Sequence, residues 1–518
     1  MASVAGVGQR LHADGAAPIV HTRGGAVSGV EVDRSYRYLR IPFAAPPVGA
    51  LRFRPPVRER AWQGVRDGTI LGAVCPQPLD PLDGPMGTLD PPADEAACLT
   101  VNVWMPTFPP AAQAGHPIFV WMHGGSWRNG FGGEPTYDGA AFARDGVVAV
   151  SFNYRLHALG LLDLRALFPD AHDTANLALR DAIAALEWTR DNAAAFGADA
   201  DNVTICGESA GAAGVGALLA APAAQGLFHR AILQSGSCHQ VLEPAEAQHI
   251  AERFLTEVGV TPGDWPALQT VSVQRVVAAA SDARRLVSGS DGRPLRLPWN
   301  TVRDDDSLPR TGYEALTAGA LRDVDLLCGT TADEFRLRWL IEEPNVEPAP
   351  LAHLSAVQQR RLVDAYRRAG RGATRRDLHE AVTNDQSFLL PAVRAADAHT
   401  HHGGRTFMYL FSWPSPVLGG RIGAAHALEN GFVFDTLVTP GFHGEDPPRE
   451  LARDMHGAWV RFTATGDPNG GSLPKWPTHD AASRPVLRFD VPCELLHAPF
   501  QTELEAWADV ADAALGVF

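Results

Sequence analysis

Residues 207–211 form the pattern Gly-x-Ser-x-Gly with Ser209 at its centre, and they join an apolar run to a run of small residues. The apolar run 203–206 is typical of a buried strand, and residues 210–221 are typical of a helix packed closely on a sheet. A serine on so sharp a turn presents its hydroxyl at the edge of a sheet, where it can attack an acyl carbon. Glycines fit on both sides because larger side chains would block the approach of strand and helix. The pattern predicts a nucleophilic serine.

Strand and helix patterns alternate on both sides of Ser209. Residues 175–196 carry apolar side chains at helical spacing. Short apolar runs predict further strands at 116–122, 146–152, 230–234, 325–329, 406–411 and 486–489. This alternation predicts an α/β fold, with a central, mostly parallel sheet flanked by helices.

A length of 518 residues would ordinarily suggest several domains. No linker, charge block or repeat divides the chain, and a hydrophobic content of 45% supplies a large core. We therefore expect one domain over residues 1–518, with helical insertions at about 245–320 and 335–400 that cover the site. A loop at about 80–95 is also expected to line it.

Composition excludes several classes of function. The net charge of -15 comes from scattered acidic residues and argues against a nucleic-acid partner. No apolar run reaches the ~18 residues of a membrane span, and residues 1–20 lack the features of a secretory signal. The six cysteines have no metal-type spacing, so neither a metal nor a cofactor is predicted. We expect a cytoplasmic protein whose partner is a small molecule.

A serine nucleophile needs a base to take its proton and an acid to orient that base. In this fold class these groups follow in the order serine, acid, histidine. Asp333 and Glu334 both lie just beyond the predicted strand 325–329, where open α/β sheets place their sites. Position alone does not separate the two acids.

His426 is the favoured base, because it ends the small-residue sequence Gly-Ala-Ala-His, which lets an imidazole approach Ser209. His399, His401 and His402 are expected to form a polar surface cluster, and His379 lies in a charged helical stretch. The histidines that follow Glu334 and compete with His426 are His353, His379, His399, His401, His402, His443, His456, His479 and His497.

The oxyanion that forms when a serine attacks an acyl carbon also needs hydrogen-bond donors. The sequence His-Gly-Gly-Ser at 123–126 directly follows a predicted strand, and glycines there let backbone N–H groups point into the site. The N–H of Ala210, the residue after the nucleophile, would complete the set. His123 is expected to be a structural hydrogen-bonding residue.

Blocks along nearly the whole chain resemble the type-B carboxylesterases, relatives of the cholinesterases within the α/β-hydrolase fold. Those blocks, in order, are 41–49 with 51–53, 75–77, 98–104, 123–125, 153–156, 196–197, 202–211, 234–236, 423–429 and 466–469. Bacterial para-nitrobenzyl esterases are similar in the same way.

The resemblance implies Ser209 as nucleophile, Glu334 as acid and His426 as base. It also implies an oxyanion hole formed by the N–H groups of Gly125, Ser126 and Ala210, and a possible disulfide between Cys75 and Cys98. Ser126 departs from the family pattern, which has Gly or Ala, and His157 stands where the family has Gly. The loop between the two cysteines has no tryptophan to stack on a quaternary ammonium, which disfavours choline esters.

The sequence thus predicts a carboxylic-ester hydrolase that works through an acyl-enzyme on small to medium acyl or aryl esters. An amidase or carbamate hydrolase with the same triad is the first alternative. The second is a non-catalytic adhesion protein on this fold, which the complete set of candidate residues disfavours.

Overall fold

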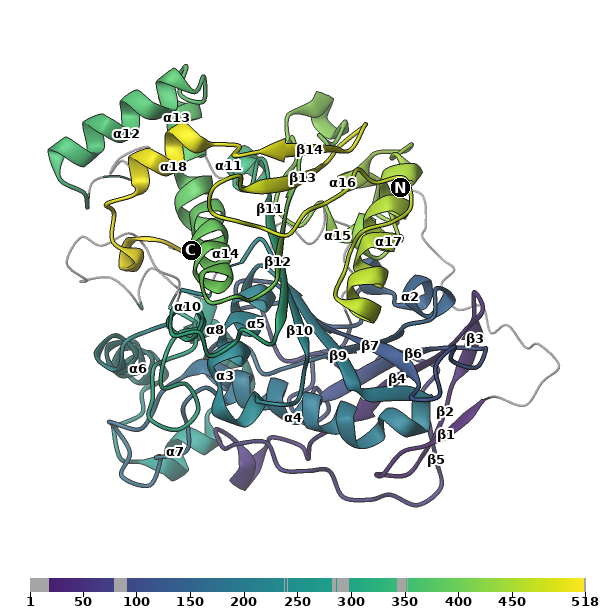
Figure 1. Cartoon of the computed structure of the whole chain (residues 1–518). Coiled ribbons are helices and arrows are strands. Elements are labelled where there is room, and N and C mark those ends of the chain that lie inside the picture. Colours follow the sequence, from purple (N-terminus) through teal and green to yellow (C-terminus); the bar gives the residue numbers. More distant parts are fainter. Residues whose placement is uncertain are drawn as a thin grey trace.

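An eleven-stranded sheet runs through the centre of the protein in a computed structural model (Figure 1). The structure describes residues 18–78, 91–236, 238–239, 241–281, 286, 298–341, 351 and 353–516. Most of the N-terminal stretch 1–20, most of the loop at 80–95 and parts of both predicted insertions lie outside these ranges. None of the helices within the described ranges combines the length and apolar character that a membrane crossing requires.

Seven strands of the sheet run parallel, in the spatial order β8-β7-β9-β10-β11-β12-β13. Their bounds are β7 His116–Met122, β8 Val148–Phe152, β9 Ala198–Glu208, β10 Arg230–Gln234, β11 Asp325–Thr331, β12 Thr406–Phe411 and β13 Pro485–Phe489. The strand that follows β7 in sequence, β8, pairs with one edge of β7, and the next strand, β9, pairs with its opposite edge. Such a reversal of strand order marks the place where α/β sheets bind ligands.

Antiparallel strands extend the sheet at both edges: β3 Val30–Val32, β4 Ser35–Pro42 and β6 Thr100–Pro106 at one, and β14 Glu494–His497 at the other. A separate three-stranded sheet is formed by β1 Ile19–His21, β2 Ala26–Ser28 and β5 Val65–Asp67.

Side chains alternate between the two faces of each strand and enter two separate cores. In β7, Val120 packs into one core, while Phe119 and Trp121 pack into the other. The first core is covered by α4 Leu177–Asn192, α5 Ala210–Ala220 and α14 Leu390–His401. The second is covered by α2 Ala140–Arg144 and α17 Arg449–Thr465 (Figure 1). Both faces are therefore buried, as continuous apolar strands require.

The predicted α/β-hydrolase sheet is confirmed. Within the predicted insertion 335–400, α14 packs on β11 and β12, and two further helices form a third apolar cluster with the C-terminal helix. The helices of this cluster are α12 Ala356–Arg368, α13 Arg375–Asn384 and α18 Gln501–Trp507, which lie side by side in Figure 1. The predicted division into one domain with two covering insertions stays a proposal.

Candidate active site

Ser209 occupies a strained turn between β9 and α5. Its φ of 55° and ψ of -125° lie in a region that residues other than glycine rarely adopt. The Ser209 N–H donates to the carbonyl of Gln234 in β10 at 2.9 Å, which ties the turn to the neighbouring strand. Because the turn holds the side chain off the end of β9, the hydroxyl lies at the carboxyl edge of the sheet.

The two flanking glycines are required by close backbone contacts. A Cβ on Gly207 would lie 2.4 Å from the carbonyl carbon of Gly211. A Cβ on Gly211 would lie 2.1 Å from the carbonyl oxygen of Met122 at the end of β7. Neither contact can relax cheaply, because each involves backbone atoms. Both glycines are therefore needed because a larger side chain would block the close approach of strand and helix, as predicted from the sequence.

His426 and Glu334 lie together beyond the ends of β12 and β11. The Nδ1 atom of His426 lies 2.6 Å from Oε2 of Glu334, whose side chain is buried. The other carboxylate oxygen accepts from the N–H of Thr331 at 2.9 Å, which fixes the carboxylate plane. With Nδ1 held by this acid, Nε2 is the atom directed toward the Ser209 turn.

Asp333 contacts the loop that carries His426 and not the imidazole itself. Its Oδ2 accepts from the N–H of Ala424 at 2.9 Å, and Oδ1 lies 2.6 Å from the Arg336 guanidinium. Asp333 therefore fastens the loop that carries His426 to the end of β11. Of the two acids left open by the sequence, Glu334 is the one in contact with the imidazole.

Several competing histidines lie elsewhere. Nε2 of His443 and Nδ1 of His456 pair with the backbone carbonyls of Leu428 and Val433. His399 was expected at the surface, but it is buried, because Thr406 Oγ1 and the Leu321 carbonyl satisfy its two ring nitrogens. His401 and His402 are exposed, as predicted.

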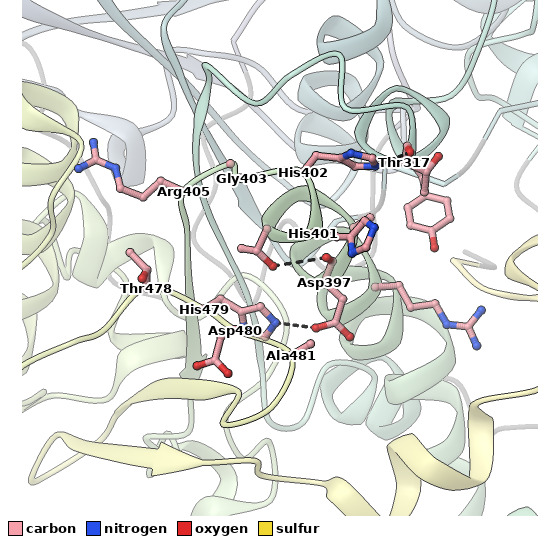
Figure 2. Close-up of a pocket in the computed structure, with 15 residues that line it drawn as sticks. Thr317, Asp397, His401, His402, Gly403, Arg405, Thr478, His479, Asp480 and Ala481 are labelled. Atoms are coloured by element: carbon pink, nitrogen blue, oxygen red, sulfur yellow. Dashed lines mark hydrogen bonds and ion pairs between the residues drawn. The ribbon is translucent and has the colours of Figure 1, made fainter.

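The pocket in Figure 2 also lies away from Ser209. It has a volume of about 900 Å³, and most of its lining residues precede β12 and β13, at the amino edge of the sheet. His479 lines it and pairs with Asp397 at 2.7 Å. This pocket lies at the edge opposite the Ser209 turn, so it does not belong to the candidate site.

Glu208 was missed by the sequence analysis. Its Oε1 lies 3.0 Å from Nε2 of His426, and its side chain is almost fully buried. A charged residue inside the Gly-x-Ser-x-Gly turn was the available signal. Because Glu208 directly precedes Ser209, this contact places the imidazole at the serine turn.

Three buried carboxyl groups affect the imidazole: Glu208 and Glu334 lie close to it, and Glu429 acts on it electrostatically. Burial raises the pKa of Glu208 to about 7, and Glu334 adds to the rise while His426 opposes it. Burial also holds the pKa of Glu429 well above its ordinary value. Burial by itself lowers the pKa of His426, but the Glu208 and Glu334 carboxylates outweigh it and raise this pKa to about 9. The site therefore favours the protonated imidazole.

The loop after β7 lies against the serine turn. A Cβ on Gly124 would lie 3.2 Å from Cβ of Ser209. Gly125 has a φ of 112°, and a Cβ there would lie 2.1 Å from the Asn129 carbonyl oxygen. Ser126 follows with a φ of 55°. The loop predicted to supply oxyanion donors therefore borders Ser209, as does Ala210, the first residue of α5.

His123 and Gln77 make hydrogen-bond contacts with the backbone of this loop. His123 is buried, its Nδ1 lies 2.8 Å from the Gly124 carbonyl, and burial lowers its pKa to about 4. It is therefore neutral, in the structural role that was predicted. Gln77 donates to the Gly130 carbonyl at 3.2 Å and accepts from the Gly130 N–H at 2.7 Å.

Cys75 and Cys98 are buried free thiols. A hydrogen bond with Cys75 and burial together hold the pKa of Cys98 well above its usual range. The disulfide implied by the resemblance is not formed in the structure and stays a prediction. Within the described ranges, no group of three His, Cys, Asp or Glu side chains is arranged to hold a metal ion.

A serine in a strained strand-to-helix turn, at the carboxyl edge of this sheet, with an imidazole and a carboxylate beside it, defines a serine hydrolase of the α/β-hydrolase fold. A model of the carboxylesterase family matches residues 16–507. The chain belongs to this family, and the protein is a serine hydrolase of carboxylic esters.

Similar proteins match this chain over almost its whole length. The "Para-nitrobenzyl esterase" of Bacillus subtilis is 35% identical over 485 residues, covering 91% of this chain and 94% of the relative. The "Phenmedipham hydrolase" of Pseudarthrobacter oxydans is 35% identical over 489 residues, with the same coverage of 91% and 94%. The crystal structure of a Geobacillus stearothermophilus carboxylesterase at pH 6.2 superposes with a TM-score of 0.82 and 35% identity, covering 94% of this chain and 99% of that one.

Proposed function

We propose that Ser209, His426 and Glu334 form the catalytic triad of a carboxylesterase acting on small to medium acyl or aryl esters. The observation that carries the proposal is the 2.6 Å contact between Nδ1 of His426 and Glu334. The loop that carries His426 also brings Nε2 to 3.0 Å from Glu208, the residue before Ser209. The names of the relatives, a para-nitrobenzyl esterase among them, support esters with an aromatic component.

The reaction follows from these positions. Nε2 of His426 takes the hydroxyl proton while Ser209 Oγ bonds to the ester carbonyl carbon, and the carbonyl electron pair moves onto oxygen. The N–H groups of Gly125, Ser126 and Ala210 stabilise this oxyanion. When the oxyanion collapses, the carbon–oxygen bond to the alcohol breaks and the departing oxygen takes the proton from His426. Water then repeats both steps on the acyl-enzyme.

Covalent labelling tests the nucleophile directly. An aryl phosphonate should phosphonylate Ser209 stoichiometrically, because its phosphorus accepts the serine oxygen and releases the aryl oxide. Intact-mass measurement and peptide mapping should place one adduct on the peptide containing residue 209, with esterase activity lost in parallel. An adduct on another residue, or inactivation without an adduct, would contradict the proposal.

The pH dependence should follow the charge around the imidazole. Only neutral His426 can accept the serine proton, and the nearby carboxylates raise its pKa to about 9. The kcat/KM value should therefore increase with pH up to about this value and fall as the imidazole is protonated at lower pH. Replacing Glu208 by Gln removes one stabilising charge, so the acid limb should move to lower pH by about one unit or more.

Full pH profiles of kcat/KM for wild type and Glu208→Gln make this measurement. Glu450→Gln is the matched control, because Glu450 is exposed on α17 and pairs only with Arg453 among the ion pairs of the described residues. An acid limb that stays in place, or that moves to higher pH in Glu208→Gln, would show that Glu208 does not set the pKa of the base.

A further inference from the structure

The loop predicted to supply oxyanion donors has a strained backbone. Gly125, Ser126 and Trp127 have φ values of 112°, 55° and 58°, so three consecutive residues have positive φ. Residues with a Cβ rarely adopt this region, and such conformations persist only where surrounding contacts hold them. The backbone of Ser126 and Trp127 therefore depends on bonds from outside the loop.

His157 supplies one of these bonds from the segment that follows β8. Its N–H donates to the Trp127 carbonyl at 2.7 Å, directly beyond the two loop residues predicted as oxyanion donors. His157 is fully buried at the start of α3 His157–Leu161 and has a φ of 40°. Because this conformation also needs support, the position of the His157 N–H depends on what holds its side chain.

The imidazole of His157 joins this residue to a third part of the chain. Nε2 lies 2.7 Å from the Pro76 carbonyl oxygen, which can only accept, so Nε2 carries the proton and donates it. Burial lowers the pKa of His157 to about 4, so near neutral pH the ring is uncharged and Nδ1 carries a lone pair. Nδ1 has no hydrogen-bond partner within the part of the chain that the structure describes. Among those residues, the bond to Pro76 is therefore the one hydrogen bond of the ring.

The segment 75–77, which contains Pro76, also holds the far end of the loop. Gln77 accepts from the Gly130 N–H at 2.7 Å and donates to the Gly130 carbonyl at 3.2 Å. The same short segment is therefore connected to the loop at two points, directly at Gly130 and through His157 at Trp127. A shift of the loop away from the serine turn would break at least one of these connections.

The position of the loop matters because oxyanion donors act only when they are aimed at the developing charge. Loss of one donor typically lowers the rate by about 10²–10³-fold, and a displacement of about 1 Å can cost about 10²-fold. The type-B carboxylesterase pattern has glycine at the position of His157, so a chain with that pattern lacks this imidazole. The connection through Pro76 is a feature of the present sequence.

We propose that His157 is a positioning residue of the oxyanion hole. Its imidazole, bonded to Pro76, holds the Trp127 carbonyl in place, and with it the two preceding N–H groups that are predicted to bind the oxyanion. The inference rests on the proposed function, since it takes those N–H groups as the oxyanion donors. It assigns a role to a side chain that the bond-making steps do not use.

Three variants of His157 test the role of the imidazole with 4-nitrophenyl acetate. His157→Gly removes the ring and keeps the N–H, at a φ that glycine adopts freely. Its kcat should fall roughly tenfold while KM changes by less than about twofold, because oxyanion donors act on the transition state more than on the bound ester. His157→Gln places an amide N–H near the position of Nε2 and should recover most of kcat. His157→Asn ends near the position of Nδ1 and should not.

His116→Ala is the matched control. His116 is also a buried histidine whose ring nitrogens face backbone carbonyls, those of Gly146 at 2.9 Å and Phe108 at 3.1 Å. It begins β7, whereas the oxyanion loop follows the other end of that strand. This variant should lower thermal stability and keep the wild-type kcat.

All rates are to be expressed per Ser209 labelled by the aryl phosphonate, so that unfolded molecules do not contribute. The inhibition constant of an aryl trifluoromethyl ketone, whose adduct with Ser209 carries an oxyanion, should rise in His157→Gly by the same factor as kcat falls. If His157→Gly does not fold, the comparison of His157→Asn with His157→Gln decides by itself.

A wild-type kcat in folded His157→Gly, or a loss confined to KM, would overturn the inference. Equal losses of kcat in all three His157 variants would also overturn it, because the bond to Pro76 would then not be what positions the loop. If wild type takes no phosphonate label and hydrolyses no ester, the proposed function itself fails.

Discussion

Replacing Ser209 by alanine is expected to lower kcat by about 10⁵- to 10⁶-fold, which is the scale seen when the nucleophile of a serine hydrolase is removed. The loss is this large because no other group can form the acyl-enzyme, so the two-step route is closed. Residual turnover should come from the oxyanion donors and from substrate binding. Single-turnover and steady-state rates with 4-nitrophenyl acetate measure the effect.

The same variant should keep its substrate affinity and its fold. Ser209 makes its backbone contacts through its N–H and carbonyl, and alanine retains both. Ser28→Ala is the matched control, because the Ser28 hydroxyl bonds to the Arg66 carbonyl in the small sheet, far along the chain from the site. Full activity in Ser209→Ala, with wild-type mass and fold verified, would refute the mechanism.

Replacing Glu334 by glutamine is expected to lower kcat by about 10⁴-fold, the second-largest effect. Glutamine keeps the shape of the side chain but presents an amide to Nδ1 of His426. The imidazole is then held in the wrong tautomer or orientation, and the imidazolium formed during acylation loses its neighbouring charge. The kcat value at saturating ester, with KM measured in parallel, tests this expectation.

Asp333→Asn provides the matched comparison, because Asp333 is adjacent in sequence and pairs with Arg336 and the Ala424 N–H instead of the imidazole. Asp333→Asn should lower the thermal stability of the protein, and its loss of kcat should be smaller than that of Glu334→Gln. Equal losses of kcat in the two variants would mean that loop position, and not the contact between Glu334 and His426, limits the reaction.

Much of the sheet could be predicted because buried parallel strands are continuous apolar runs. The runs at 116–122, 230–234 and 406–411 match β7, β10 and β12 residue for residue. The strand before Ser209 begins earlier than predicted, at Ala198, because that residue pairs with His116 across an irregularity in register. Pairing across a sheet is a tertiary property, so apolar periodicity does not reveal such an extension.

The site was predictable where a residue depends on its local turn and not where it depends on distant contacts. Ser209 and Gly207 follow from the sterics of their own turn. Asp333 and Glu334 both follow β11 closely, and only the fold decides which one contacts the histidine. His399 seemed a surface residue because its burial depends on Leu321, far away in sequence. Phe388, whose ring centroid lies 5.1 Å from that of His426, gave no signal, since the sequence pattern does not distinguish a π-helix from an ordinary helical turn.

The π-helix that carries Phe388 has a consequence for laboratory evolution of the enzyme. The proposed reacting groups sit beyond the ends of β7, β9, β11 and β12, whereas the π-helix Asp385–Leu389 is held through Arg371, Tyr366 and the C-terminal helix. Mutations in those supporting layers can shift the Phe388 ring against His426 while the strand ends keep their geometry. Libraries directed at residues 366–389 and 500–507 should therefore yield altered selectivity more often than lost reactivity.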